Sequence, residues 1–182
     1  MPDTDVAESF PDLLRAQIRH GFTAAQQYLA AAVYFDSNRL PQLAGHGYGR
    51  SREQYAHALR MVQYLLDRDF YVQIGGLDEI CSTFEDPRAA IAFLLELEQT
   101  RSTQISDLAR AARVSGDYLG ERFIQWFLEE QVRNVARTTT LLTVIDRAAG
   151  QLFDVEEFVA RELQAPQPFD GTAPKMAGAA KN

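Results

Sequence analysis

The feature that most constrains this chain is the helical spacing of its apolar residues over four long segments. Between Asp12 and Tyr34, apolar side chains recur three and four positions apart, as at Leu14, Ile18 and Phe22, which is the period of one helix face. The same period predicts further helices over Gln42–Arg68, Arg88–Val114 and Tyr118–Ala149, and a short fifth helix over Asp154–Leu163. Long helices with one apolar face bury that face best by packing side by side in a bundle.

The lengths of the connections predict the topology of this bundle. Short turns at Asp36–Pro41 and Ser115–Asp117 join the first helix to the second and the third to the fourth, so each pair is expected to be antiparallel. The segment Phe70–Pro87 contains Gly75-Gly76 and is long enough, at ~3.3 Å per extended residue, to span the bundle. We therefore expect the second and third helices to run parallel.

Composition and charge narrow the class of protein. The chain has 182 residues, of which 46% are hydrophobic, and this predicts one globular domain over 1–163 followed by a Pro-, Gly- and Ala-rich, disordered tail over 164–182. The net charge of −7 argues against nucleic-acid and anionic-membrane partners. The single cysteine, Cys81, forms no internal disulfide and fits a reducing, cytoplasmic setting. The acidic start, Met1–Phe10, does not have the pattern of a signal peptide.

Five motifs stand in the chain in a definite order: Phe22-Thr-Ala-Ala-Gln-Gln-Tyr28, Val33-Tyr-Phe-Asp36, Leu65-Leu-Asp-Arg-Asp69, Gly116-Asp-Tyr-Leu-Gly-Glu121 and Gln125-Trp-Phe-Leu-Glu-Glu-Gln131. They resemble those of bacterial non-haem ferritins, especially the actinobacterial ones, over about residues 10–163. The resemblance implies an all-α, ferritin-like four-helix bundle with a long crossover between helices 2 and 3 and a short fifth C-terminal helix. It also implies a cytoplasmic homo-oligomer, a hollow cage of 24 subunits that oxidises Fe(II) and stores iron.

The resemblance places the ligands of a diiron site in the middle of the bundle. Two ferrous ions bring about +4 of charge into a buried position, which several carboxylates and an imidazole must neutralise. The positions that keep a suitable side chain are His57, Glu98 and Gln131, with Tyr28 supporting Glu98. The positions where the resemblance implies a carboxylate and this chain has none are Gly21, Gln54 and Asn134.

One carboxylate does not balance two ferrous ions, so we expect a degenerate ferroxidase centre. Two outcomes remain open at this stage: a residual single-ion site at His57, Glu98 and Gln131, or a metal-free hydrogen-bond network that also includes Tyr28 and Gln54. Glu53 is a possible substitute ligand. It lies one residue before Gln54, however, and one residue turns the side chain ~100° around a helix, so we expect it to point away from the core.

Arginines stand where ferritins commonly line the cage interior with acidic residues. They are Arg50, Arg52 and Arg60 in the second helix and Arg133 and Arg137 in the fourth. These side chains are interpreted as surface charge, as partners in salt bridges between subunits, or as an altered cage interior that holds anions. Haem is not expected, because Tyr55 occupies the place of the axial methionine of bacterioferritins.

Three functions follow from these observations. The first is an iron-storage cage subunit with an impaired ferroxidase site, which builds the shell or co-assembles with an active ferritin. The second is an active, iron-oxidising ferritin with substitute ligands. The third is a cage that serves as a scaffold or binds anions instead of iron.

Overall fold

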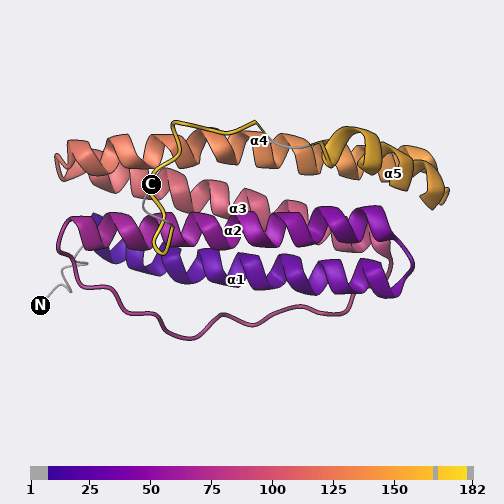
Figure 1. The fold of residues 1–182 in the computed structure, drawn as a ribbon, viewed down its shortest axis with the longest axis horizontal. Coiled ribbons are helices and arrows are strands. Elements are labelled where there is room, and N and C mark those ends of the chain that lie inside the picture. The colour runs from indigo at the N-terminus through magenta and orange to yellow at the C-terminus, as the bar shows by residue number, and fades with distance from the viewer. Residues whose placement is uncertain (1–7, 166–167, 180–182) are drawn as a thin grey trace, which may run out of the picture.

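The computed structural model describes residues 8–165 and 168–179, and these form a bundle of helices without strands (Figure 1). The four long helices are α1 (Phe10–Ser37), α2 (Pro41–Asp67), α3 (Pro87–Val114) and α4 (Tyr118–Ala148). The short helix α5 (Leu152–Phe158) continues into a π-helical turn over Val159–Leu163. The predicted all-α fold is confirmed, and the helix ends lie within a few residues of those predicted.

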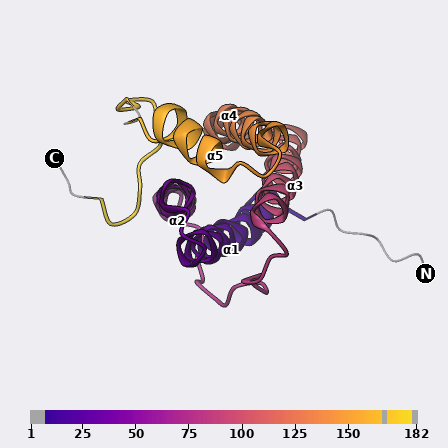
Figure 2. The ribbon, with the colours of Figure 1, turned by 90° about the vertical axis from the view of Figure 1, so that its right-hand side faces the viewer.

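The topology is also the one that the connection lengths predict. Three residues join α1 to α2 and three join α3 to α4, and each pair is antiparallel (Figure 1). The segment between α2 and α3 runs along the outside of α1 for most of the bundle's length, as both views show (Figures 1 and 2). The chain therefore returns to its starting end, and α2 and α3 run parallel.

Local capping residues define where the helices begin. Prolines occupy the first turns of α1, α2 and α3, where the missing backbone N–H leaves no helical hydrogen bond unmade. The Asp86 carboxylate accepts from Ala89 N (2.7 Å) at the start of α3, and the Asp117 carboxylate accepts from Gly120 N (2.9 Å) at the start of α4. These contacts satisfy backbone donors that have no partner within the helix.

The start of α2 is capped by a residue that is distant in sequence. Leu40, which precedes the helix, provides no side-chain cap. The Glu156 carboxylate of α5 accepts instead from the backbone N–H groups of Gln42 (2.8 Å) and Leu43 (2.9 Å). An anion is favoured at this position by the helix dipole, so the contact fixes α5 against this end of the bundle (Figure 2).

The apolar core is divided into two clusters, one toward each end of the bundle. One cluster surrounds Leu14, Ile18, Met61, Leu65, Ile105, Leu108, Ile124 and Phe127. The other surrounds Phe35, Leu40, Leu43, Ile91, Leu94, Leu141, Ile145 and Val155. The residues between them are buried and polar, and they include His57, Glu98 and Gln131, which were predicted as ligands.

The residues after the π-helical turn cross from α4 to α2 (Figure 1). Trp126 Nε1 donates to Asp170 Oδ2 (2.8 Å), and Ala177 N donates to the Leu59 carbonyl (3.1 Å). The predicted domain boundary at 163 and the disorder of 164–182 stay predictions, and they include residues 166–167 and 180–182, which lie outside the described part. The acidic stretch over residues 1–7 lies outside it as well. None of the described helices combines the length and apolarity needed to cross a membrane.

Candidate metal centre

A layer of buried polar side chains crosses the middle of the bundle. Helical steps of three, four and seven residues bring them to the inward faces of three helices. They are Arg50, Gln54 and His57 on α2, Glu98 and Arg101 on α3, and Gln131 and Asn134 on α4. We call these seven residues the polar layer. From α1, Tyr28 reaches into it.

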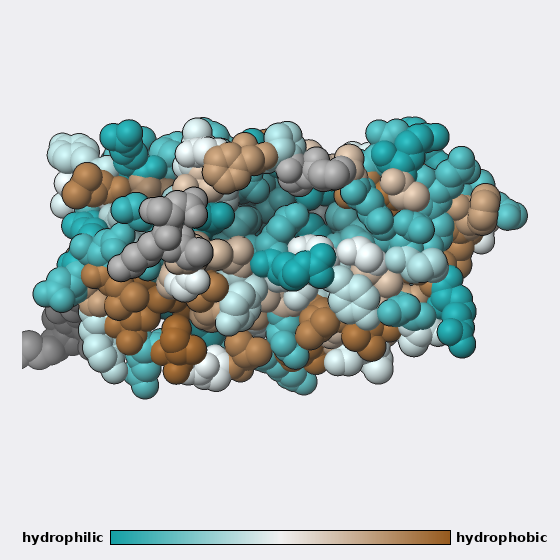
Figure 3. All heavy atoms as spheres, viewed as in Figure 1, coloured by the Kyte–Doolittle hydropathy of each residue, from teal (hydrophilic) through white to brown (hydrophobic). Residues whose placement is uncertain are grey.

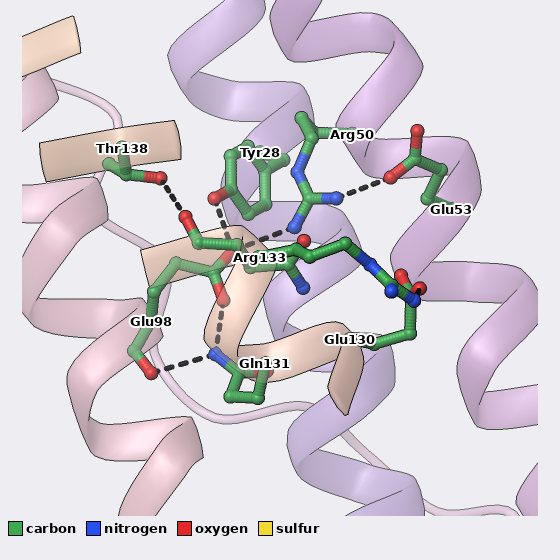
Figure 4. A network of polar contacts seen from close by, with 9 residues as sticks. Tyr28, Arg50, Glu53, Glu98, Glu130, Gln131, Arg133 and Thr138 are labelled. Atoms are coloured by element: carbon green, nitrogen blue, oxygen red, sulfur yellow. Dashed lines mark hydrogen bonds and ion pairs between the residues drawn. The ribbon is translucent and has the colours of Figure 1, made fainter. Parts of the chain in front are cut away.

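Both oxygens of the Glu98 carboxylate are engaged, and the side chain is fully buried. Oε1 accepts hydrogen bonds from the Tyr28 hydroxyl and from Arg50 Nη2 (2.9 Å). Oε2 accepts from Gln131 Nε2 (2.6 Å) (Figure 4). The structure thus brings together Tyr28, Glu98 and Gln131 as the sequence suggests, and adds an arginine.

The prediction that Arg50 belongs to the surface is wrong. Its side chain is 3% exposed, and it bridges Glu98 through Nη2 and Glu53 through Nη1 (Figure 4). Arg50 precedes Gln54 by four residues and His57 by seven, so all three share one face of α2. That spacing is the signal in the sequence that indicates a core position for Arg50.

Glu98 and Arg50 form an ion pair, and the Tyr28 phenol beside them is neutral. Burial alone would raise the pKa of Glu98, but the charges of Arg50 and Arg101 and the hydrogen bond from Tyr28 hold it below its ordinary value. Burial alone would lower the pKa of Arg50, but the charges of Glu98 and Glu53 and the hydrogen bond to Glu98 raise it above its ordinary value. Burial and the Glu98 charge raise the pKa of Tyr28, so its hydroxyl stays protonated and donates.

A second guanidinium, Arg101, is buried one turn beyond Glu98. It is 3% exposed, and its Nη1 donates to the His20 carbonyl (3.3 Å). Burial lowers its pKa, which the Glu98 charge opposes. Within the described part of the chain it forms no ion pair, so the polar layer holds two cations and one carboxylate. Sequence reasoning missed Arg101, although it lies three residues after Glu98 on the same face of α3.

His57 and Gln54 do not join Glu98, which corrects the predicted network. The His57 ring packs edge-on against Trp126 (5.1 Å between centroids) and Phe127 (6.0 Å). Burial and the charges of Arg50 and Arg101 hold its pKa well below the ordinary value, so the ring is neutral. The amide atoms of Gln54 and Asn134 are buried and have no hydrogen-bond partner among the described residues.

Gly21 is a packing residue at the crossing of α1 and α2. A Cβ placed on it would lie 3.0 Å from Ala58 Cβ, closer than side-chain atoms ordinarily approach. Glycine therefore allows the two helices to approach closely, and a glutamate at this position would require α2 to shift. The prediction that Gly21 stands at a lost ligand position stays a prediction.

The described residues offer few ligands for a metal. Nowhere in the described ranges do three or more His, Cys, Asp or Glu residues gather as a metal site. Glu53, the possible substitute ligand, is 40% exposed at its side chain and pairs with Arg50. His57, Glu98 and Gln131, the predicted residual site, share the layer, but the guanidinium of Arg50 occupies one of the Glu98 oxygens.

A four-helix bundle with one long crossover, a short fifth helix and a polar layer at its middle defines the ferritin-like class of helical proteins. A family model described as a ferritin-like domain matches residues 11–148, and the chain therefore belongs to the ferritin family. The resemblance found in the sequence motifs is confirmed.

Individual relatives agree with this assignment. Ferritin BfrB of Mycolicibacterium smegmatis is 53% identical over 171 residues, which cover 94% of each chain. A bacterial non-heme ferritin of Staphylococcus aureus is 26% identical over 149 residues, 78% of this chain and 86% of its own. Among solved structures, an open pore ferritin from Archaeoglobus fulgidus superposes with a TM-score of 0.80 at 25% identity, covering 87% of this chain and all of that one.

Proposed function

We propose that this chain is the subunit of a cytoplasmic ferritin cage with an impaired or lost ferroxidase site. It builds the shell of an iron-storage assembly of 24 subunits, alone or together with an active ferritin subunit. Iron is then the cargo of the assembly, and its oxidation depends on another subunit or on solution chemistry. Membership of the ferritin family and the high identity to BfrB over nearly the whole chain support the storage role.

The single observation that carries the loss of activity is the ion pair between Arg50 and Glu98. An iron ion at this position would need the Glu98 carboxylate, whose oxygens already accept from Tyr28, Arg50 and Gln131. It would also be repelled by a fixed guanidinium. At an effective dielectric constant near 20, a unit charge about 4 Å away contributes about 4 kcal/mol of repulsion per unit charge.

The arginine therefore acts as a tethered cation that replaces the metal. Glu98 keeps a positive partner, and the core keeps a hydrogen-bonded carboxylate, without any ion from solution. No haem is included in the proposal, because Tyr55 occupies the methionine position and its ring packs on Phe22 (5.1 Å between centroids).

The test is the rate of aerobic Fe(II) oxidation by the assembled, iron-free protein, at about two Fe(II) per subunit, the complement of a diiron site. The proposal predicts a rate close to that of a protein-free control. A fast rate that saturates near this ratio would overturn it and favour an active ferritin with substitute ligands.

A gain-of-function variant tests the mapping of the site. Gly21→Glu, Arg50→Gln and Gln54→Glu would restore carboxylates and remove the cation, with Ala58→Gly added to make room beside residue 21. We expect faster iron oxidation than in Arg122→Gln, which removes an exposed arginine of α4. No gain in a folded, assembled variant would contradict the assigned ligand positions.

A further inference from the structure

A pocket opens on the surface between α2, α4 and the residues that follow α5. Its volume is about 430 Å³, and its polar lining comes from His46, Arg50, Arg52, Glu53 and Arg137. In the space-filling view, hydrophilic residues gather in the hollow between α4 and α2 (Figure 3). This pocket is separate from the polar layer and contacts it only through Arg50.

Two glycines one helical turn apart, Gly45 and Gly49, form part of the pocket wall. Neither has the positive φ that would require glycine, so their effect is to leave space on this face of α2. A Cβ on Gly49 would have Arg52 Nη2 as its nearest neighbour, at 4.0 Å, which places the Arg52 guanidinium beside the hollow. At the other end, Gln164 closes over Gly45 and donates to the Gln42 carbonyl (2.9 Å).

The charges around the pocket do not cancel. Arg50 forms ion pairs with both Glu98 and Glu53. Among the charged residues that line the pocket, three arginines outweigh one carboxylate, that of Glu53. Over residues 8–165 and 168–179, neither Arg52 nor Arg137 forms an ion pair or a side-chain hydrogen bond. Burial and the charges of Arg50 and Arg137 lower the pKa of His46 to about 3, so its ring is neutral and carries one N–H donor. The pocket therefore keeps an excess of positive charge, with two guanidinium groups that have no ion-pair partner among the described residues, although the Glu53 carboxylate also lines it.

We propose that this pocket binds a tetrahedral oxyanion of the phosphate class, held by Arg137 and Arg52 with His46 as a hydrogen-bond donor. The planar fork of each guanidinium matches two oxygens of such an anion. The volume leaves room for water that bridges the remaining oxygens to the protein. The proposal goes beyond the iron-storage role, and it holds whether or not the polar layer oxidises iron.

The experiment is calorimetric titration of inorganic phosphate into the assembled, iron-free protein in a chloride-poor buffer, because iron itself would bind phosphate. We expect one class of saturable sites, at one per subunit. Arg137→Gln should weaken binding about tenfold, the effect of losing one charge-assisted contact. Arg122→Gln removes the same charge from an exposed position of α4 outside the pocket and should change the affinity less than twofold.

Gly49→Leu provides a second variant that fills the pocket without changing any charge. Leucine favours a helix more than glycine does, so we expect the variant to fold and to lose phosphate binding. Absence of saturable binding by the wild type would overturn the proposal. Equal weakening in Arg137→Gln and Arg122→Gln would overturn it too, since it would indicate diffuse surface charge, as would unchanged binding in Gly49→Leu.

Discussion

The two ends of the bundle and its middle are buried to the same degree but are stabilised in different ways. At one end, Leu14 and Leu65 are fully buried among other apolar side chains. In the middle, Glu98 is as inaccessible as either leucine, yet its surroundings are two cations, a phenol and amides. Burial alone therefore does not define the core of this protein, because the chemistry of the partners decides what burial contributes.

The difference has a consequence for how each region tolerates change. An apolar contact at an end contributes in proportion to the area it removes from water, so the loss of one side chain is partly absorbed by its neighbours. A charge in the middle depends on a specific partner, and removal of that partner leaves an uncompensated buried ion. We expect substitutions in the middle to act jointly and those at the ends to act separately.

The largest expected effect is that of Glu98→Gln. This change leaves Arg50 with only the partly exposed Glu53 as a partner and removes the carboxylate whose charge acts on the buried Arg101. It should lower the free energy of unfolding by about 3–5 kcal/mol, as the breaking of buried ion pairs does. Urea unfolding checks it, with Glu96→Gln on the exposed face of α3 as the matched control. If the free energy of unfolding fell by less than about 1 kcal/mol, the ion pair of Arg50 and Glu98 would contribute no more than a surface ion pair. The middle of the bundle would then not differ from its ends in the way described.

Leu14→Ala measures the apolar end in the same assay. Leu14 is fully buried, and large-to-small changes at such positions lower the free energy of unfolding by about 2–5 kcal/mol. Leu66→Ala is the control, because Leu66 is 53% exposed. If Leu14→Met, which nearly conserves volume, were as damaging as Leu14→Ala, the apolar account of this end would be wrong, since such swaps usually cost less than about 1.5 kcal/mol.

The double variant Arg50→Met, Glu98→Leu sharpens the comparison by making the middle resemble an end. Replacing both members of a buried ion pair by apolar side chains is often nearly neutral. Arg101 loses the Glu98 charge in both variants, but only the double variant also removes the Arg50 cation, so we expect it to lose less stability than Glu98→Gln alone. The single variants Arg50→Met and Glu98→Leu complete the cycle. If their losses of unfolding free energy add up to the loss in the double variant, Arg50 and Glu98 are not coupled.

The smallest expected effect is the change of the free energy of unfolding with pH near neutrality. A change of pH distinguishes the middle of the bundle from its ends without altering the volume of any side chain. The pKa of Glu98 is lowered in the folded state from an ordinary value of 4.5, so its contribution is fully present above pH 4.5. That contribution is lost as the pH falls through the folded-state pKa. Acid titration of stability should be flatter for Glu98→Gln than for Leu14→Ala, and parallel curves would contradict the assignment.

The sequence predicts the fold well because the fold depends on signals that are local and repeated. Helical periodicity marks all five helices. Pro41 and Pro87, which the sequence pattern assigns to the connections, are in the structure the first residues of α2 and α3. The long segment between α2 and α3 determines which helices run parallel. Each of these features is read from adjacent residues without knowing what they contact.

The site is harder to predict because its contacts join distant helices. Gly21 appears from its motif as a lost ligand, and only the position of Ala58 shows that it permits a close helix crossing. Arg50 has the helical spacing of a core residue, but arginine is a residue type usually found at the surface. The residue that it contacts, Glu98, lies 48 positions away in the sequence. A long, flexible side chain reaches partners that periodicity does not identify.

The most direct test of the account is a crystal of the iron-free protein soaked anaerobically in Fe(II), with anomalous scattering recorded at the iron edge. The account predicts no iron peak beside Glu98 and an intact contact between Arg50 Nη2 and Glu98 Oε1. An iron peak coordinated by Glu98, with the Arg50 side chain displaced, would contradict the claim that a tethered cation has replaced the metal.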